Sequence, residues 1–155
     1  MSKKGALIHK LDSLKQKHPR EFEDVGVENV EFFLDIDTEP EEILQIIDNF
    51  KNHFKLIIRT ILLNQNNSEL YKCESDNVYA MRFKNKTANS RIYCQEQHIK
   101  GEKRKIIMSR GLSNKTSQKN NKTNLPIIES VKKESYTFLY SKEDEERHKK
   151  NKKSK

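Results

Sequence analysis

The sequence predicts an α+β protein in which helices pack on a small sheet. Three short runs of strand-forming residues, at 78–83, 91–94 and 106–108, are separated by polar turns. Between positions 38 and 63, apolar residues recur every three or four positions, which is typical of an amphipathic helix. Hydrophobic residues make up 33% of the chain and charged residues 35%. That composition allows one modest core, with further segments outside it.

The N-terminal region, residues 1–37, is interpreted as an extension of the main domain. Residues 5–17 place Leu7, Leu11 and Leu14 on one face of a predicted helix, which ends before Pro19. Residues 27–36 are rich in strand-forming side chains and predict a possible strand. The extension is therefore expected to contain one helix and possibly one strand.

The main domain is expected to cover residues 38–140. Its first helix begins where Thr38 can cap, Glu41 can complete a capping box and Pro40 fits the first turn, and it continues to about residue 63. We expect this helix to pack on the sheet formed by the later strands.

A second helix of this domain is predicted over residues 126–140, beginning at Pro126. Ile128 and Val131 lie on its apolar side. Residues 141–155 contain no apolar side chain and form a predicted charged tail.

Positive charge is concentrated in one stretch of the chain. Residues 82–122 hold twelve Lys or Arg and two acids, a local charge of +10, whereas the whole chain carries +8. The first 76 residues hold fifteen acids and ten basic residues, a charge of −5. This asymmetry favours a scaffold half and a second half that faces a polyanion.

Two arginines of the predicted strands are the first candidates for phosphate binding. Side chains alternate along a strand, so Arg82 lies opposite the apolar face of its strand, and Arg91 shares a face with Tyr93. If the two strands pair through the turn at 84–89, both arginines reach one face of the sheet. Guanidinium groups placed in this way suit bidentate phosphate binding. The alternative is that they form ion pairs with acids of the helices.

The loop after the third strand supplies the second set of candidates. No acid occurs between Lys103 and Asn124, whereas ordinary surface loops mix both signs of charge. We expect phosphates to be bound by basic residues of this loop and of the turn at 84–89, namely Lys84, Lys86, Arg110, Lys115, Lys119 and Lys122. The alternative is a solvated loop in a lysine-rich chain.

Tyr93 and His98 are the candidates for proton transfer. Tyr93 shares a predicted face with Arg91, although a tyrosine at strand spacing is often part of a core. His98 lies in the connection between the second and third predicted strands. No Cys–His spacing or carboxylate cluster indicates a metal, so we expect no metal and no other cofactor. The sequence shows no signal peptide and no membrane span, so a cytoplasmic location is expected.

The basic segment resembles a known family over residues 77–140. The pattern Tyr79-x-x-Arg82, then Arg91-Ile92-Tyr93, then Ile-Ile-Met-Ser-Arg-Gly-Leu at 106–112, is followed by a Lys/Thr/Gln-rich loop and a helix. It is similar to the C-terminal half of the RelE/HigB-like toxins of the RelE/ParE superfamily. The resemblance implies the toxin of a type II toxin–antitoxin system, a ribosome-associated mRNA endoribonuclease. In such enzymes, a ribose 2′-oxygen of the RNA attacks the adjacent phosphate, and no metal is used.

The same resemblance implies a RelE-like fold with a small, twisted, mostly antiparallel sheet, and it also implies roles and partners. Arg91 matches the strand arginine of the family's site, Arg82 matches a basic position on the preceding strand, and Lys115 or Lys119 matches its basic loop. The implied partners are a cognate antitoxin, mRNA and the ribosome. Many HigB-like members have His-Gly where this chain has Arg110-Gly111, which puts that proton-transfer role in doubt. A non-catalytic RNA- or ribosome-binding protein and a gyrase-directed ParE-like toxin remain alternatives.

Overall fold

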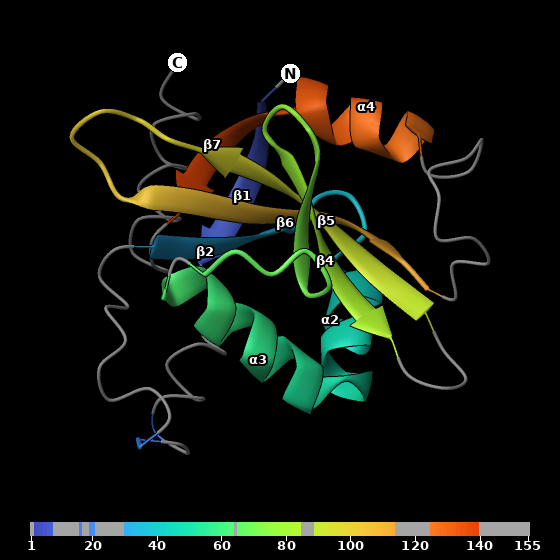
Figure 1. The fold of residues 1–155 in the computed structure, drawn as a ribbon. Helices are drawn as coiled ribbons and strands as arrows, with labels where there is room; N and C mark the ends of the chain where they lie inside the picture. The colour runs from blue at the N-terminus through green and yellow to red at the C-terminus, as the bar shows by residue number, and fades with distance from the viewer. Residues whose placement is uncertain are drawn as a thin grey trace.

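A mixed sheet of seven strands, with helices on both faces, forms the protein in the computed structural model (Figure 1). The structure describes residues 2–7, 16, 19–20, 30–63, 65–84, 89–113 and 125–139. The strands are β1 (Ser2–Leu7), β2 (Val30–Asp35), β3 (Tyr71–Ser75), β4 (Val78–Lys84), β5 (Asn89–Gln97), β6 (Arg104–Leu112) and β7 (Ser135–Leu139), in the sheet order β3-β4-β5-β6-β2-β1-β7. The helices described are α2 (Pro40–Asn49), α3 (Lys51–Leu62) and α4 (Leu125–Lys133).

The α+β class is confirmed. Strands β3 to β6 are consecutive antiparallel neighbours, while β2 pairs in parallel with β6 and β1 in parallel with β7. The three predicted strands correspond to β4, β5 and β6, and the predicted strand at 27–36 corresponds to β2. The sequence reading missed β3, whose sequence Tyr-Lys-Cys-Glu-Ser has few strand-forming residues because it is a half-exposed edge strand.

The predicted helix over 38–63 is two helices with a break at Phe50. Phe50 has φ −128° and ψ 49°, outside the helical region. Its ring is buried and lies 5.7 Å from that of Phe83 on the sheet. The break lets α2 and α3 each turn an apolar side toward the sheet. The periodic pattern continues across it because Phe50 itself faces the core.

The predicted capping box is also wrong, although Pro40 does occupy the first turn. Glu39 is the N-cap residue, and its side chain makes no capping hydrogen bond. The Thr38 hydroxyl instead donates to Asp35 Oδ2 at 2.9 Å. Asp35 also accepts from the backbone N–H groups of Asp37 and Thr38, at 2.9 and 3.1 Å. The Thr38 hydroxyl, which was predicted to cap the helix, is therefore hydrogen-bonded to the Asp35 carboxylate instead.

Both predicted terminal helices need correction. Residues 5–7 of the first belong to strand β1, and most of the remainder lies outside the described residues. The helix predicted over 126–140 ends at Lys133, and strand β7 follows. These two segments pair in parallel with each other, so contacts between the chain ends override the local helical pattern. Gly5 is on β1, which lies between β2 and β7, and it has no side chain. The rings of Phe33 on β2 and Phe138 on β7 therefore contact each other over Gly5, with centroids 4.7 Å apart.

The core lies on both faces of the sheet. The larger part fills the space between the sheet and helices α2 and α3, and the smaller part lies under α4, seen on the opposite face in Figure 1. Within the described residues, none of the helices combines the length and apolar character that a membrane crossing requires.

Candidate functional site

Arg82 and Arg91 are direct neighbours across β4 and β5, on the same face of the sheet, as predicted. Their surroundings differ. Arg91 is 1% exposed, and its Nη1 lies 3.3 Å from Oε1 of Glu74, which is buried as well. The prediction that Arg91 binds a phosphate is therefore wrong for this conformation, because burial and Glu74 already engage its charge. The expected alternative partner was a helix acid, whereas Glu74 belongs to the unpredicted strand β3.

Tyr93 is part of the core and does not face solvent. It is 0% exposed and packs in the cluster of Val78, Ala80, Ile128 and Val131, under α4. The predicted proton-transfer role therefore fails for lack of access. The alternative reading, a core tyrosine, is the correct one.

Gln95 holds α4 in place over this face. Its side-chain amide donates to the Val131 carbonyl at 2.9 Å and to the Glu134 carbonyl at 2.8 Å. These carbonyls lie at the C-terminal end of α4, where helical acceptors lack intrahelical donors. The sheet face that was expected to hold RNA around Arg91 is thus covered by a helix.

His98 lies at the far end of the sheet from the two arginines. It comes seven residues after Arg91 along β5, which is about 23 Å of extended chain. Its exposed ring has Nε2 2.9 Å from Glu96 Oε1. The structure therefore does not bring His98 together with Arg82 and Arg91, and its predicted place in one catalytic site is wrong.

The remaining basic candidates divide into described and undescribed residues. The half-buried Arg110 engages Glu39, with Nε 2.6 Å from Oε1, so one part of its guanidinium is already occupied by an ion pair. Lys84 is exposed at the end of β4. The predicted residues Lys86, Lys115, Lys119 and Lys122 lie outside the described residues.

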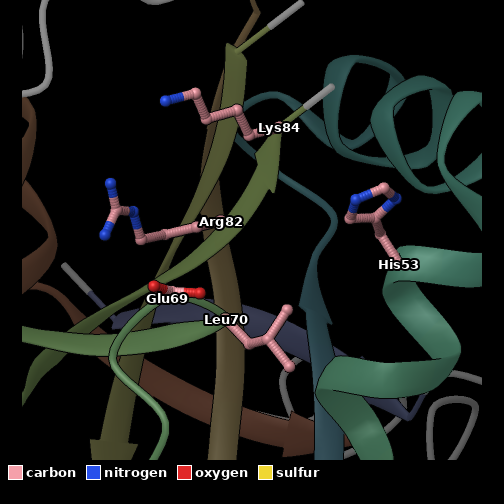
Figure 2. Close-up of a pocket in the computed structure, with 5 residues that line it drawn as sticks. All are labelled: His53, Glu69, Leu70, Arg82 and Lys84. Atoms are coloured by element: carbon pink, nitrogen blue, oxygen red, sulfur yellow. The ribbon is translucent and has the colours of Figure 1, made fainter. Parts of the chain in front are cut away.

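A cavity of about 450 Å³ lies where β4 extends past the start of β3. It is lined by His53, Glu69, Leu70, Arg82 and Lys84 (Figure 2). Arg82 Nη1 donates to the Ser68 carbonyl at 3.1 Å, which fixes the guanidinium beside the opening. In Figure 2, Arg82 and Lys84 project together to one side of β4, while His53 reaches in from α3 on the other.

Sequence reasoning missed His53 and Glu69 in this cavity. His53 lies on the predicted helix over 38–63, and its ring packs edge-on against Phe50, with centroids 5.5 Å apart. Glu69 comes just before β3, the strand that was not predicted. The pairing of β3 with β4 brings residues 69 and 70 beside Arg82. Glu69 could have been predicted only if β3 had been recognised as a strand.

A second group of charged residues lies at the opposite end of the same strands. Arg104 donates to the buried Glu96 carboxylate twice, from Nε at 3.0 Å and from Nη2 at 2.6 Å. The Tyr71 hydroxyl donates to the same carboxylate. Burial, followed by the charges of Cys94 and Glu96, raises the pKa of Tyr71 well above its ordinary value, so this phenol stays protonated.

Arg104 also stays charged. Burial alone would lower the pKa of its guanidinium, but the hydrogen bond and charge of Glu96 outweigh burial and raise it. Beside Arg104 is a cavity of about 220 Å³, lined by Ile61, Gln65, Asn66, Tyr71, Tyr79 and Arg104.

No protein-family model matches the chain, and comparisons with curated proteins and with solved structures found no significant match. Within the part of the chain that the structure describes, no three His, Cys, Asp or Glu side chains are grouped to hold a metal ion.

Proposed function

We propose that this protein binds RNA at the Arg82 end of the sheet and acts there as a ribosome-associated mRNA endoribonuclease, the toxin of a type II toxin–antitoxin pair. The observation that carries the proposal is the cavity lined by Arg82, Lys84, His53 and Glu69. An arginine and a lysine, together with two groups able to exchange a proton, are the parts that metal-independent cleavage of RNA requires.

The distribution of charge supports RNA as the ligand at this end. The registers Lys84 with Asn89 and Arg91 with Leu112 place the β4–β5 turn and the start of the β6–α4 connection at one end of the sheet. The undescribed parts of these two connections, 85–88 and 114–124, contain four lysines and no acid in sequence. A concentrated positive charge of this kind attracts the phosphate backbone without regard to base sequence.

The proposed chemistry assigns roles to residues of the cavity. Arg82 and Lys84 bind the scissile phosphate and stabilise the charge that develops on it, since arginine stays protonated at any cellular pH. His53 takes the proton of the ribose 2′-oxygen as that oxygen bonds to the phosphorus and the bond from phosphorus to the 5′-oxygen breaks. Glu69 is the second proton-exchanging group, which gives a proton to the departing 5′-oxygen. Arg91 supports the strand pair from beneath α4. This assignment moves the reaction from the buried Arg91–Tyr93 face to the open edge of β4.

The enzyme proposal is tested by RNA cleavage on ribosomes, with matched histidine variants. His53→Gln is expected to slow cleavage at least 100-fold, in the range seen for general acid–base groups. His98→Gln replaces an exposed histidine at the far end of the sheet and is expected to leave the rate unchanged. Cleavage should persist in EDTA, once ribosome integrity is controlled for, and leave 2′,3′-cyclic phosphate ends. Equal rates for His53→Gln and the parent would refute the assignment.

A non-catalytic RNA- or ribosome-binding protein is the second candidate. It is favoured by the burial of Tyr93 and by the distance of His98 from Arg82, which remove two of the predicted proton-transfer groups from the basic end. Mapping new mRNA 5′ ends after induction in a host separates the two functions. New ends support the toxin, whereas RNA binding with normal growth and no new ends supports the binding protein.

The proposed partner is an antitoxin whose acidic segments cover the Arg82 end of the sheet. An uncovered field of this strength would otherwise bind RNA throughout the cell. Purification from the native operon should therefore recover a second small protein, and Arg82→Glu should weaken its binding. Recovery of this chain alone, with normal growth on overexpression, would count against the toxin.

A further inference from the structure

The 220 Å³ cavity beside Arg104 combines aromatic faces with hydrogen-bonding groups. The rings of Tyr71 and Tyr79 are stacked, with centroids 4.9 Å apart and planes 14° apart. The cavity is also lined by Gln65 and Asn66 from the loop after α3, whose exposed side chains offer amide donors and acceptors. Its volume suits one small planar group and is below that of typical drug-sized pockets.

Two residues that line this cavity, Arg104 and Tyr71, are held in place by the buried carboxylate of Glu96. Glu96, with its side chain 1% exposed, receives two hydrogen bonds from Arg104 and one from the Tyr71 hydroxyl. These contacts occupy one edge of the guanidinium and fix the orientation of the tyrosine ring. Arg104 also lines the cavity, and its side chain is 22% exposed. A site built in this way is preorganised and loses little entropy on binding.

We propose that this cavity is a nucleobase subsite, which takes one unpaired base of the RNA bound at the Arg82 end. The base stacks on the tyrosine pair, its edge meets Gln65 and Asn66, and Arg104 binds the neighbouring phosphate. Unpaired bases are recognised in proteins by aromatic stacking of this type, together with hydrogen bonds to the base edge. The inference rests on the proposed RNA-binding function and adds a second point of contact to it.

The two cavities lie along the same elements. His53 of the first and Ile61 of the second are eight residues apart on α3, about 12 Å along the helix axis. Tyr79 and Arg82 are three residues apart on β4, about 10 Å. The segment 65–71 contributes to both cavities. Tyr79 and Arg82 project from opposite faces of β4, so one RNA strand that contacts both cavities has to pass around the edge of the sheet, where β4 extends beyond the start of β3.

The test uses nucleoside monophosphates as probes, so that it does not depend on RNA cleavage or on binding at the Arg82 end. Binding of AMP, GMP, CMP and UMP to the full chain is followed by NMR, with the side-chain amides of Gln65 and Asn66 as reporters. We expect at least one nucleotide to shift these signals. Tyr79→Leu should weaken its binding about 5- to 100-fold, which corresponds to the loss of one base–aromatic stack.

Two control variants make the test specific. Tyr79→Phe keeps the ring and should bind like the parent, and Arg82→Gln alters the other cavity and should also bind like the parent. Retention of the parental melting temperature in Tyr79→Leu shows that any loss is not caused by unfolding.

Three outcomes would overturn the subsite. The first is that no nucleotide shifts the reporter amides; the second is equal binding by Tyr79→Leu and the parent. The third is an equal response to ribose 5-phosphate, which would identify an anion site without base recognition. Weaker binding of a co-purified protein by Tyr79→Leu, with no nucleotide response, would assign the cavity to a protein partner instead. If no nucleotide binds this cavity but the parent protein binds RNA, the subsite is refuted and the proposed function stands. If the parent protein binds neither nucleotides nor RNA, both the subsite and the proposed function are refuted.

Discussion

Two Arg–Glu pairs, each with one residue on β5, have opposite surroundings. Arg91 and Glu74 are each 2% exposed in their side chains and lie on the face that α4 covers, whereas Arg104 pairs with Glu96 beside an open cavity. In both pairs a buried carboxylate fixes an arginine. The difference is whether the outer edge of the guanidinium meets protein or a cavity. An arginine–carboxylate pair therefore indicates a binding site only when one edge of the cation remains accessible.

The largest expected effect concerns the closed pair. Arg91→Met leaves the Glu74 carboxylate buried without this cation and should lower the free energy of unfolding by about 3–5 kcal/mol. The double variant Arg91→Met with Glu74→Met should recover much of that loss, because two apolar side chains can replace a buried ion pair. Urea denaturation of the parent, both single variants and the double variant measures the coupling. Additive single effects would show that the pair is not the stabilising unit.

This result also decides how loss of function at Arg91 is interpreted. Abolished toxicity in Arg91→Ala would follow from unfolding alone and would not identify a catalytic residue. A folded Arg91→Ala protein that retains its melting temperature but fails to bind RNA would contradict the closed description of this pair.

The open pair should show a smaller loss of stability. Arg104→Met removes two charge-assisted hydrogen bonds from Glu96, at a cost on the order of 2 kcal/mol. The effect is smaller than at Arg91 because the Tyr71 hydroxyl still donates to Glu96 and because Arg104 is partly exposed to solvent. Thermal denaturation checks the order of the two effects. A larger loss for Arg104→Met than for Arg91→Met would reverse the comparison.

A third variant converts the closed site toward the open one. Gln95→Met removes both hydrogen bonds to the C-terminal carbonyls of α4 and should lower stability by about 1–3 kcal/mol. Hydrogen exchange in α4 should become faster, while exchange in α2 and α3 stays unchanged. Gln97 donates from Nε2 to Gln95 Oε1 at 2.8 Å and so orients the Gln95 amide, and Gln97→Met should therefore speed exchange in α4 by a smaller amount. Unchanged exchange in α4 would mean that packing alone holds this helix.

The smallest effect is expected at a surface pair. Lys132 Nζ lies 2.8 Å from Asp76 Oδ2, and hydrogen bonding and charge from Lys132 lower the pKa of Asp76 below its ordinary value of 3.8. A lowered pKa in the folded state adds stability that is present above pH 3.8 and is lost as the carboxylate takes up its proton at lower pH. Lys132→Ala should barely change the melting temperature at pH 7, and not at all near pH 2. A large change at pH 7 would show an unrecognised role for α4 charges.

The sequence predicted the strands that carry the basic residues but not what covers them. Regular alternation in β4 and β5 was enough to place Arg82 and Arg91 on one face, because hairpin pairing follows from a short turn. The partner Glu74 was not predictable, since β3 is an edge strand whose stability comes from pairing with β4 rather than from its own residues. An amphipathic pattern in α4 predicted a helix but could not tell which face of the sheet it packs on. His53 was not predicted as part of the site for the same reason, because the sequence does not show where α3 lies against β4.

The most direct test of the account is the salt dependence of RNA affinity. The central claim is that Arg82 and Lys84 contact phosphates, so Arg82→Gln with Lys84→Gln should reduce the slope of log K against log salt by about 1.4 for single-stranded RNA. Arg20→Gln with Lys133→Gln removes the same two charges from exposed positions elsewhere and should leave the slope nearly unchanged. A parental slope in the first double variant, or an equal reduction in the second, would contradict RNA binding at this end of the sheet.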